Sequence, residues 1–210
     1  MKNIESLVAE KLLQINAIKL NPANPFTWAS GWKSPIYCDN RKILSYPETR
    51  DIVKNEFAAL LNEKYKNAEI IAGVATGAIA HGVLVADLLN LPFIYIRSAS
   101  KTHGLENLIE GELKAGKKVV VIEDLISTGG SSIKAVEAIR EKNAEVLGML
   151  AIFSYGFEKA KENFEKANCT LTTLTNYNCL IDIALKTGYI EEKYLESLNQ
   201  WRMQPELWKQ

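Results

Sequence analysis

Two adjacent carboxylates, followed by a turn rich in hydroxyls and glycines, stand out in the middle of the chain. The segment reads Val119-Val120-Val121-Ile122-Glu123-Asp124-Leu125-Ile126-Ser127-Thr128-Gly129-Gly130-Ser131. Hydroxyl and backbone N–H donors at the start of a helix form a cradle for a phosphate monoester. Carboxylates accept hydrogen bonds from hydroxyl groups, so the paired acids suit a sugar rather than a phosphate. The segment therefore predicts a site for a phosphorylated sugar.

A simpler interpretation exists for each part of this segment. A Gly-Gly pair is often only a turn, and an acidic pair is often only the solvated end of a strand. The complete order of apolar run, two acids and Ser-Thr-Gly-Gly favours a binding site. The segment lacks the lysine of a Walker A loop and the G-x-G-x-x-G spacing, so it supports neither a nucleoside triphosphatase nor a dinucleotide site.

A second group of chemically active residues lies in the polar stretch 97–111. Arg97, Lys101 and His103 are concentrated there, between an apolar run and Gly111. A long polar loop in a compact domain is usually a lid or a solvated tip. The clustered cations favour a lid that closes over a polyanion such as diphosphate. A protonated His103 would also serve as a general acid, because imidazole titrates near neutral pH.

The elements that must position these residues alternate along the chain. Short apolar runs predict strands at 70–75, 92–97, 118–123, 146–153 and 169–175. One helical pattern begins at Pro47. Others cover 78–89, 132–142, 177–186 and 191–199. This alternation predicts an α/β fold with an open, Rossmann-like parallel sheet flanked by helices. Ligands bind beyond the carboxyl ends of such strands, which is where both polar segments begin.

The 210 residues suit a single domain. Residues 1–45 do not share the alternation and are expected to form a small hood, with 46–210 as the α/β core and a C-terminal tail. Trp201 and Trp208 are expected to dock that tail onto the body or a partner.

The 25 Lys and Arg balance 25 Asp and Glu, which argues against a nucleic-acid partner. With no apolar stretch of membrane-spanning length, we expect no membrane partner and a soluble, cytoplasmic protein.

The acidic pair and the turn after it resemble the phosphoribosyl diphosphate (PRPP) motif of the type I phosphoribosyltransferases. The resemblance implies that Glu123 and Asp124 hold the ribose hydroxyls. It also implies that the loop after them binds the rest of PRPP, with the 5′-phosphate on its last residues. The residues concerned are Leu125, Ile126, Ser127, Thr128, Gly129, Gly130 and Ser131.

Two further segments resemble the orotate phosphoribosyltransferases within that family. Residues 97–104 match the catalytic-loop pattern R-x-x-x-K-x-H-G, and residues 30–35 match the S-G-x-x-S-P pattern of the orotate-side hood. The resemblance implies transfer of ribose 5-phosphate from PRPP to orotate in pyrimidine biosynthesis. Arg97, Lys101, His103 and Asp124 would be the catalytic residues. It further implies a homodimer whose lids act across the interface, and a Mg²⁺ cofactor bound through PRPP, without an assigned protein ligand.

The base-binding residues are less well indicated by the pattern. Ala29 stands where the best-known members have a lysine, Tyr155 where they have an orotate-binding arginine, and a lysine is also missing from 75–80. A carboxylate such as that of orotate needs cations or N–H donors. The expected orotate-binding residues are Ser127, Lys33, Tyr37, Arg41 and Tyr155. Two alternatives stay open: a phosphoribosyltransferase for a purine such as xanthine, and a non-catalytic PRPP-sensing regulator.

Overall fold

A six-stranded sheet forms the centre of the computed structural model, which describes residues 3–28, 30–97 and 108–209. The strand order is β10-β9-β8-β5-β6-β7; β7 runs antiparallel to β6, and the other neighbouring strands are parallel. The strands are β5 (Ile70–Val74), β6 (Phe93–Ile96), β7 (Ile109–Glu110), β8 (Lys118–Ile126), β9 (Glu145–Ser154) and β10 (Leu171–Asn176). The predicted open parallel sheet is confirmed except at its edge, where the short β7 pairs antiparallel to β6.

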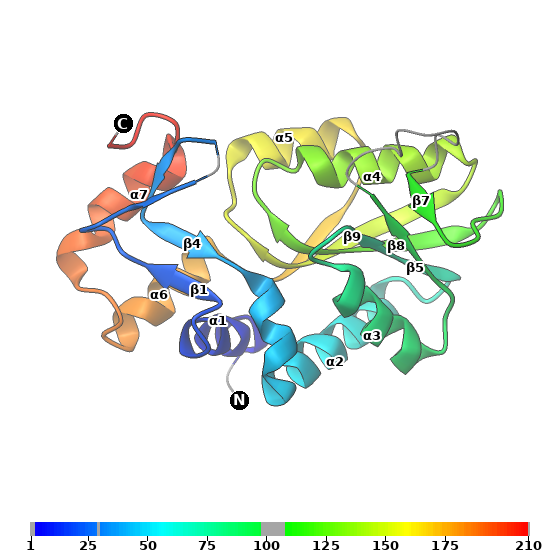
Figure 1. Cartoon of the computed structure of the whole chain (residues 1–210), viewed down its shortest axis with the longest axis horizontal. Coiled ribbons are helices and arrows are strands. Elements are labelled where there is room, and N and C mark those ends of the chain that lie inside the picture. The colour runs from blue at the N-terminus through cyan, green and yellow to red at the C-terminus, as the bar shows by residue number, and fades with distance from the viewer. Residues whose placement is uncertain (1–2, 29, 98–107, 210) are drawn as a thin grey trace.

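Helices cover both faces of this sheet (Figure 1). One face carries α2 (Pro47–Lys64) and α3 (Ile79–Leu89), and the other carries α4 (Gly130–Glu141) and α5 (Glu158–Lys166). The central strands contain long apolar runs because both of their faces are enclosed; Val119 through Ile122 of β8 are fully buried.

The central strand is longer than its apolar run predicts. We expected a strand at 118–123, but β8 continues to Ile126. Pairing with the long β9 extends it, with Leu125 beside Phe153 and Ile126 beside Ser154. The two acids therefore lie inside the strand, where successive side chains point to opposite faces.

Helix α5 was not predicted from the sequence. Its segment is EKAKENFEK, in which only Ala160 and Phe164 are buried. Two apolar positions four residues apart are enough to seat a short surface helix, but they are too few to give a recognisable periodicity.

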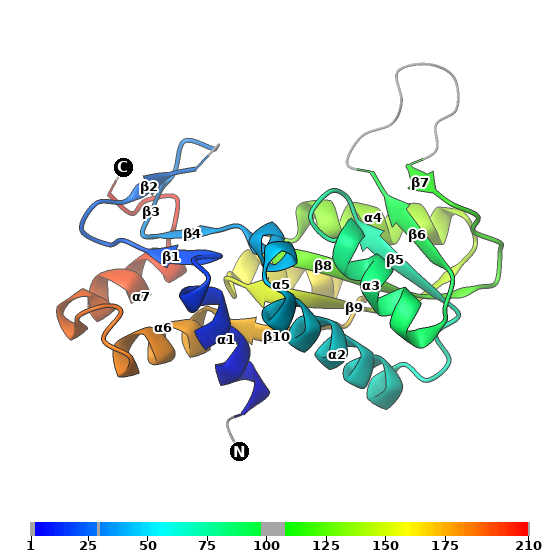
Figure 2. The same cartoon turned by 60° about the horizontal axis from the view of Figure 1, so that its bottom comes forward.

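The chain ends build a second layer beside the sheet (Figure 2). The N-terminal part contains α1 (Ile4–Gln14), β1 (Ile18–Leu20), β2 (Phe26–Thr27), β3 (Lys33–Ser34), β4 (Ile36–Cys38) and the 3₁₀ helix η1 (Asn40–Ser45). The C-terminal part contains α6 (Tyr177–Lys186), η2 (Glu192–Tyr194) and α7 (Leu195–Met203). Helix α1 packs on α6 and β10, and Lys209 Nζ donates to the Pro22 carbonyl at 2.8 Å.

No described helix is long and apolar enough to cross a membrane.

An aromatic cluster joins the two layers around Trp201 of α7. The Trp201 side chain is fully buried, with ring centroids 5.7 Å from Trp28, 5.6 Å from Tyr155 and 5.3 Å from Phe157. Trp208 is also buried. The expectation that Trp201 docks the C-terminal tail onto the body is confirmed.

Replacing Trp201 by alanine should lower the free energy of unfolding by about 3–5 kcal/mol, because the change removes a large buried ring and leaves a cavity. Urea denaturation followed by circular dichroism measures this loss. Met203 on the same helix is 78% exposed, so Met203→Ala should stay within about 0.5 kcal/mol of the wild type. Equal losses in the two variants would contradict the role given to the cluster.

Candidate active site

The two acids of β8 occupy different environments. The Glu123 side chain is 5% exposed; it accepts a hydrogen bond from Ser132 Oγ at 3.0 Å and one from the Asp124 backbone N–H at 3.0 Å. Burial, and secondarily the nearby Asp124, raises the pKa of Glu123 well above its usual range. Asp124 is half-buried. Of the pair, Asp124 is therefore the carboxylate with more access to a bound sugar.

Three segments that are distant in sequence meet at Asp124. Its carboxylate lies over Gly77 in the turn after β5, where an added Cβ would collide with it. Its backbone carbonyl accepts a hydrogen bond from Asn40 Nδ2 at 2.6 Å, and Asn40 is itself buried at the start of η1. Glycine at 77 and the amide at 40 thus set the position of the acid. The sequence patterns pointed to neither contact, because both depend on the tertiary fold.

His81 lies in the same region and is not exposed to substrate. It is 2% exposed, and its Nε2 atom has no hydrogen-bond partner among the described residues. Burial lowers the pKa of His81, an effect that the charge of Asp124 and the backbone of Asn40 oppose. We interpret this histidine as a neutral packing residue of α3.

The hydroxyl- and glycine-rich turn leads directly from β8 into α4. Gly129 has a φ of +78°, a left-handed conformation that favours glycine. Among the described residues no side chain caps α4, so the first N–H groups of this helix are available to an anion. Thr128, Gly130 and Ser131 are exposed around them. The turn therefore presents exposed hydroxyls and uncapped N–H groups at the start of α4, which is where the sequence predicts a phosphate cradle.

A cavity of about 290 Å³ opens between this turn and the hood. It is lined by Thr27, Trp28, Tyr37, Cys38, Leu125, Ser127 and Tyr155. Three of the expected base-binding residues, Ser127, Tyr37 and Tyr155, come together here. Thr27, Trp28 and Cys38 were not among the predicted site residues, since their position depends on how the hood folds over β8.

The two expected base-binding cations do not line this cavity. Lys33 Nζ donates to Thr27 Oγ1 at 3.0 Å, and Arg41 pairs with Asp39 at 2.6 Å with its side chain 63% exposed. The walls are instead aromatic: the Tyr155 ring lies 5.2 Å from that of Trp28. Burial is the main cause that raises the pKa of Tyr155 well above its usual range, so its hydroxyl stays protonated and can donate.

Arg97 begins the segment expected to form the lid. Its backbone N–H donates to the Leu108 carbonyl at 2.8 Å, and its guanidinium lies 3.5 Å from the Glu110 carboxylate. Lys101 and His103 lie outside the described residues. The structure thus places the base of this segment at the carboxyl end of β6.

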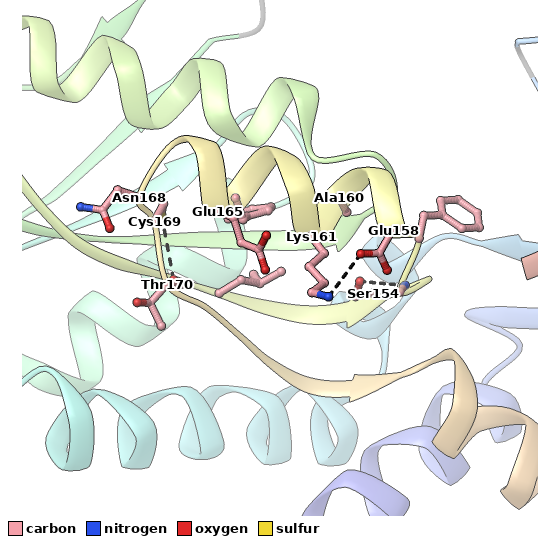
Figure 3. Close-up of a pocket in the computed structure, with 12 residues that line it drawn as sticks. Ser154, Glu158, Ala160, Lys161, Glu165, Asn168, Cys169 and Thr170 are labelled. Atoms are coloured by element: carbon pink, nitrogen blue, oxygen red, sulfur yellow. Dashed lines mark hydrogen bonds and ion pairs between the residues drawn. The ribbon is translucent and has the colours of Figure 1, made fainter. Parts of the chain in front are cut away.

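A larger cavity of about 640 Å³ lies elsewhere, alongside α5 (Figure 3). Its lining includes Glu158, Lys161 and Thr170 but neither acid of β8 and no residue of the hydroxyl turn. Glu158 and Lys161 pair with each other at 3.2 Å. Chemistry rather than size therefore selects the smaller cavity as the candidate site.

The fold and this site together define a phosphoribosyltransferase, and comparison with known proteins agrees. The family profile described as "Phosphoribosyl transferase domain" matches residues 41–186. The orotate phosphoribosyltransferase of Bacteroides thetaiotaomicron is 64% identical over 208 residues, covering 99% of this chain and 98% of that protein. That of Listeria innocua is 52% identical over 206 residues, covering 98% and 99%.

Solved structures show the same relationship. Orotate phosphoribosyltransferase from Aeropyrum pernix is 26% identical with a TM-score of 0.76, covering 88% of this chain and 99% of that one. The Leishmania donovani UMP synthase is 27% identical with a TM-score of 0.76, and the match covers 94% of this chain and 42% of that one. The chain belongs to the orotate phosphoribosyltransferase family of transferases. This membership favours orotate over the purine and regulator alternatives.

The buried acid makes stability depend on pH in a defined direction. Because the pKa of Glu123 is raised in the folded state, its contribution to stability is complete below about pH 4.3 and is lost as the pH rises through the folded value. Glu123→Gln keeps the shape and removes the charge. At pH 7 we expect the free energy of unfolding of this variant to exceed that of the wild type by roughly 1–3 kcal/mol. At pH 4.5 the difference between the two proteins should be smaller.

Urea denaturation at several pH values between 4.5 and 8 tests this prediction. Glu165→Gln, on the exposed surface of α5, is the control for loss of one negative charge and should stay within about 0.5 kcal/mol of the wild type. A gain for Glu123→Gln that does not change with pH would count against a buried titrating carboxyl.

Proposed function

We propose that this chain transfers ribose 5-phosphate from PRPP to orotate, producing orotidine 5′-monophosphate and diphosphate in pyrimidine biosynthesis. The observation that carries the proposal is that three features meet at the end of β8. The candidate base cavity and the hydroxyl turn share Ser127, and Asp124 lies three residues earlier, inside β8. A nucleotide likewise needs neighbouring places for its base, its ribose hydroxyls and its phosphate. The cytoplasmic location stays a prediction.

Each part of the substrate has a counterpart in the site. The 5′-phosphate would bind the turn at 127–131 and the first N–H groups of α4. The ribose hydroxyls would donate to Asp124, with Glu123 behind it. Orotate would lie in the cavity against the wall that Trp28 and Tyr155 form, within reach of the hydroxyls of Ser127 and Tyr155 and the backbone near Tyr37. Lys33 and Arg41 remain candidates for the orotate carboxylate only if the hood moves when ligand binds.

The rate enhancement would be electrostatic. As the bond from C1 of the ribose to diphosphate breaks, positive charge develops on the ribose and negative charge on the leaving group. Asp124 favours the former, while Arg97, Lys101 and His103 would neutralise the latter. Orotate then bonds to C1 through a ring nitrogen, which loses its proton to the departing diphosphate or to water, while diphosphate keeps the electron pair of the broken C1–O bond. Groups already oriented for these charges stabilise the transition state without further reorganisation.

The donor set fits a metal that arrives with its substrate. In the described part of the chain no group of three His, Cys, Asp or Glu side chains is placed to hold an ion. Asp124 is half-buried and lies where the ribose hydroxyls are expected. Mg²⁺ bound mainly by diphosphate and ribose oxygens would neutralise charge on the leaving group. Asp124 would touch it at most through the ribose hydroxyls or a water.

A homodimer is supported by the surface of α3. This helix is almost entirely apolar, and Val83 and Leu88 are 44% and 47% exposed on its outer side. An apolar helix that is only half covered is typical of a subunit interface. Because α3 follows the turn at Gly77, a second copy packed there would lie next to the active site. In such a dimer, we propose that Lys101 and His103 act on the site of the other subunit.

Turnover with separate bases tests the proposed reaction. The protein is incubated with PRPP, Mg²⁺ and one of orotate, hypoxanthine, xanthine, adenine or uracil, and diphosphate release is followed. We expect release with orotate alone. Turnover with another base in place of orotate would overturn the assignment, and no turnover with any of them would favour the regulator.

Mixing two inactive variants tests whether the lid acts across subunits. Lys101→Ala should lower kcat by about 10²–10³, the usual effect of losing one group that stabilises transition-state charge. Asp124→Asn should also be inactive or nearly so. Denatured together and refolded, the two should recover about a quarter of wild-type activity, since half the dimers are mixed and each has one intact site.

The control for this mixture is each variant refolded alone, which should stay inactive. If Lys101 served its own subunit, every site in a mixed dimer would carry one defect. No recovery would then be seen, and the lid would have to be assigned to its own chain.

A further inference from the structure

Helix α5 contacts the phosphate turn from the side opposite the expected ligand. Asn163 Nδ2 donates a hydrogen bond to the Thr128 carbonyl at 2.8 Å. One residue further along the helix, the Phe164 ring lies against Gly129, where an added Cβ would come within 2.9 Å of Phe164 Cε2. Two consecutive residues of α5 therefore hold two consecutive residues of the turn.

The hydrogen bond fixes the direction of the next N–H group. A peptide unit is planar and trans, so the Thr128 carbonyl and the Gly129 N–H point in opposite directions. With the carbonyl directed toward α5, the N–H is directed away from it, to the side where α4 begins. The Gly129 N–H makes no hydrogen bond to any residue that the structure describes. An oriented, unpaired N–H beside a helix N-terminus is a donor prepared for an anion.

The composition of α5 supports a specific role for this side chain. Apart from the buried Ala160 and Phe164, every residue of the helix except Asn163 is a lysine or glutamate. Asparagine is a weaker helix former than either, because its amide competes for backbone groups. Here the amide bonds to a different segment of the chain, 35 residues away. The hydrogen bond to the turn offsets the low helix propensity.

We propose that Asn163 is a positioning residue for the 5′-phosphate of the substrate: it acts through the Thr128–Gly129 peptide and does not touch the ligand. The inference rests on the proposed function for the identity of the phosphate. Only ligands with a 5′-phosphate should depend on Asn163, namely PRPP, orotidine 5′-monophosphate and ribose 5-phosphate. Orotate and diphosphate lack this phosphate, so their binding should not depend on Asn163.

The experiment compares Asn163→Ala, Asn163→Asp and the wild type. Calorimetry gives the Kd for ribose 5-phosphate, and steady-state kinetics give KM for PRPP and for orotate. For Asn163→Ala we expect both the Kd for ribose 5-phosphate and the KM for PRPP to rise about tenfold, the usual effect of one such hydrogen bond. The KM for orotate at saturating PRPP should stay unchanged.

Asn163→Asp should weaken the binding of ribose 5-phosphate further than Asn163→Ala does, because its carboxylate repels the Thr128 carbonyl and adds negative charge near the phosphate. This variant is nearly isosteric, so it keeps the test valid if the alanine variant folds poorly. Glu165→Ala, on the same helix and exposed, is the matched control and should bind ribose 5-phosphate as the wild type does.

Two results would overturn the proposal. One is an unchanged Kd for ribose 5-phosphate in folded Asn163→Ala and Asn163→Asp, as judged by their Tm. The other is an equal rise in KM for PRPP and orotate, which would indicate general loosening of the site. Ribose 5-phosphate binding needs no orotate, so failure of orotate turnover would contradict the proposed function while leaving this measurement decisive.

Discussion

The site depends on one constraint, the position of β8 between β5 and β9 in a parallel sheet. Parallel neighbours end at the same edge, so the turn after β5, the acids of β8 and the turn after β9 meet there. Pairing with β9 carries β8 on to Ile126 and holds Asp124 in regular backbone. The carboxylate that rests on Gly77 is thus positioned by the most enclosed part of the molecule.

This rigidity separates two adjacent acids into different roles. Strand geometry sends Glu123 toward Ser132 of α4 and Asp124 toward Gly77. Enclosure raises the pKa of the first and makes it costly to ionise.

The cavity beside Ser127 depends on both chain ends, one for its lining and the other for support. The hood supplies Trp28 and Tyr37, and Trp201 of α7 packs against Trp28 and Tyr155 from behind. Residues 1–45 therefore do not form the hood alone, since α6 and α7 complete the same layer. An aromatic wall supported in this way fits a planar base, and the cations expected there from the sequence lie outside it.

The sequence by itself determined the α/β class with its parallel strands, the place of the acidic pair and glycine turn at the end of a strand, and the family, because strand periodicity and a contiguous motif are local properties. It did not reveal α5, whose two buried residues are too few to form a pattern. Asn40, Gly77, Trp28 and Asn163 also escaped it. Each acts through a partner far along the chain, so only the tertiary structure decides what it contacts. The physical reason is that hydrogen bonds and packing depend on distance in space, whereas a motif records only neighbours along the backbone.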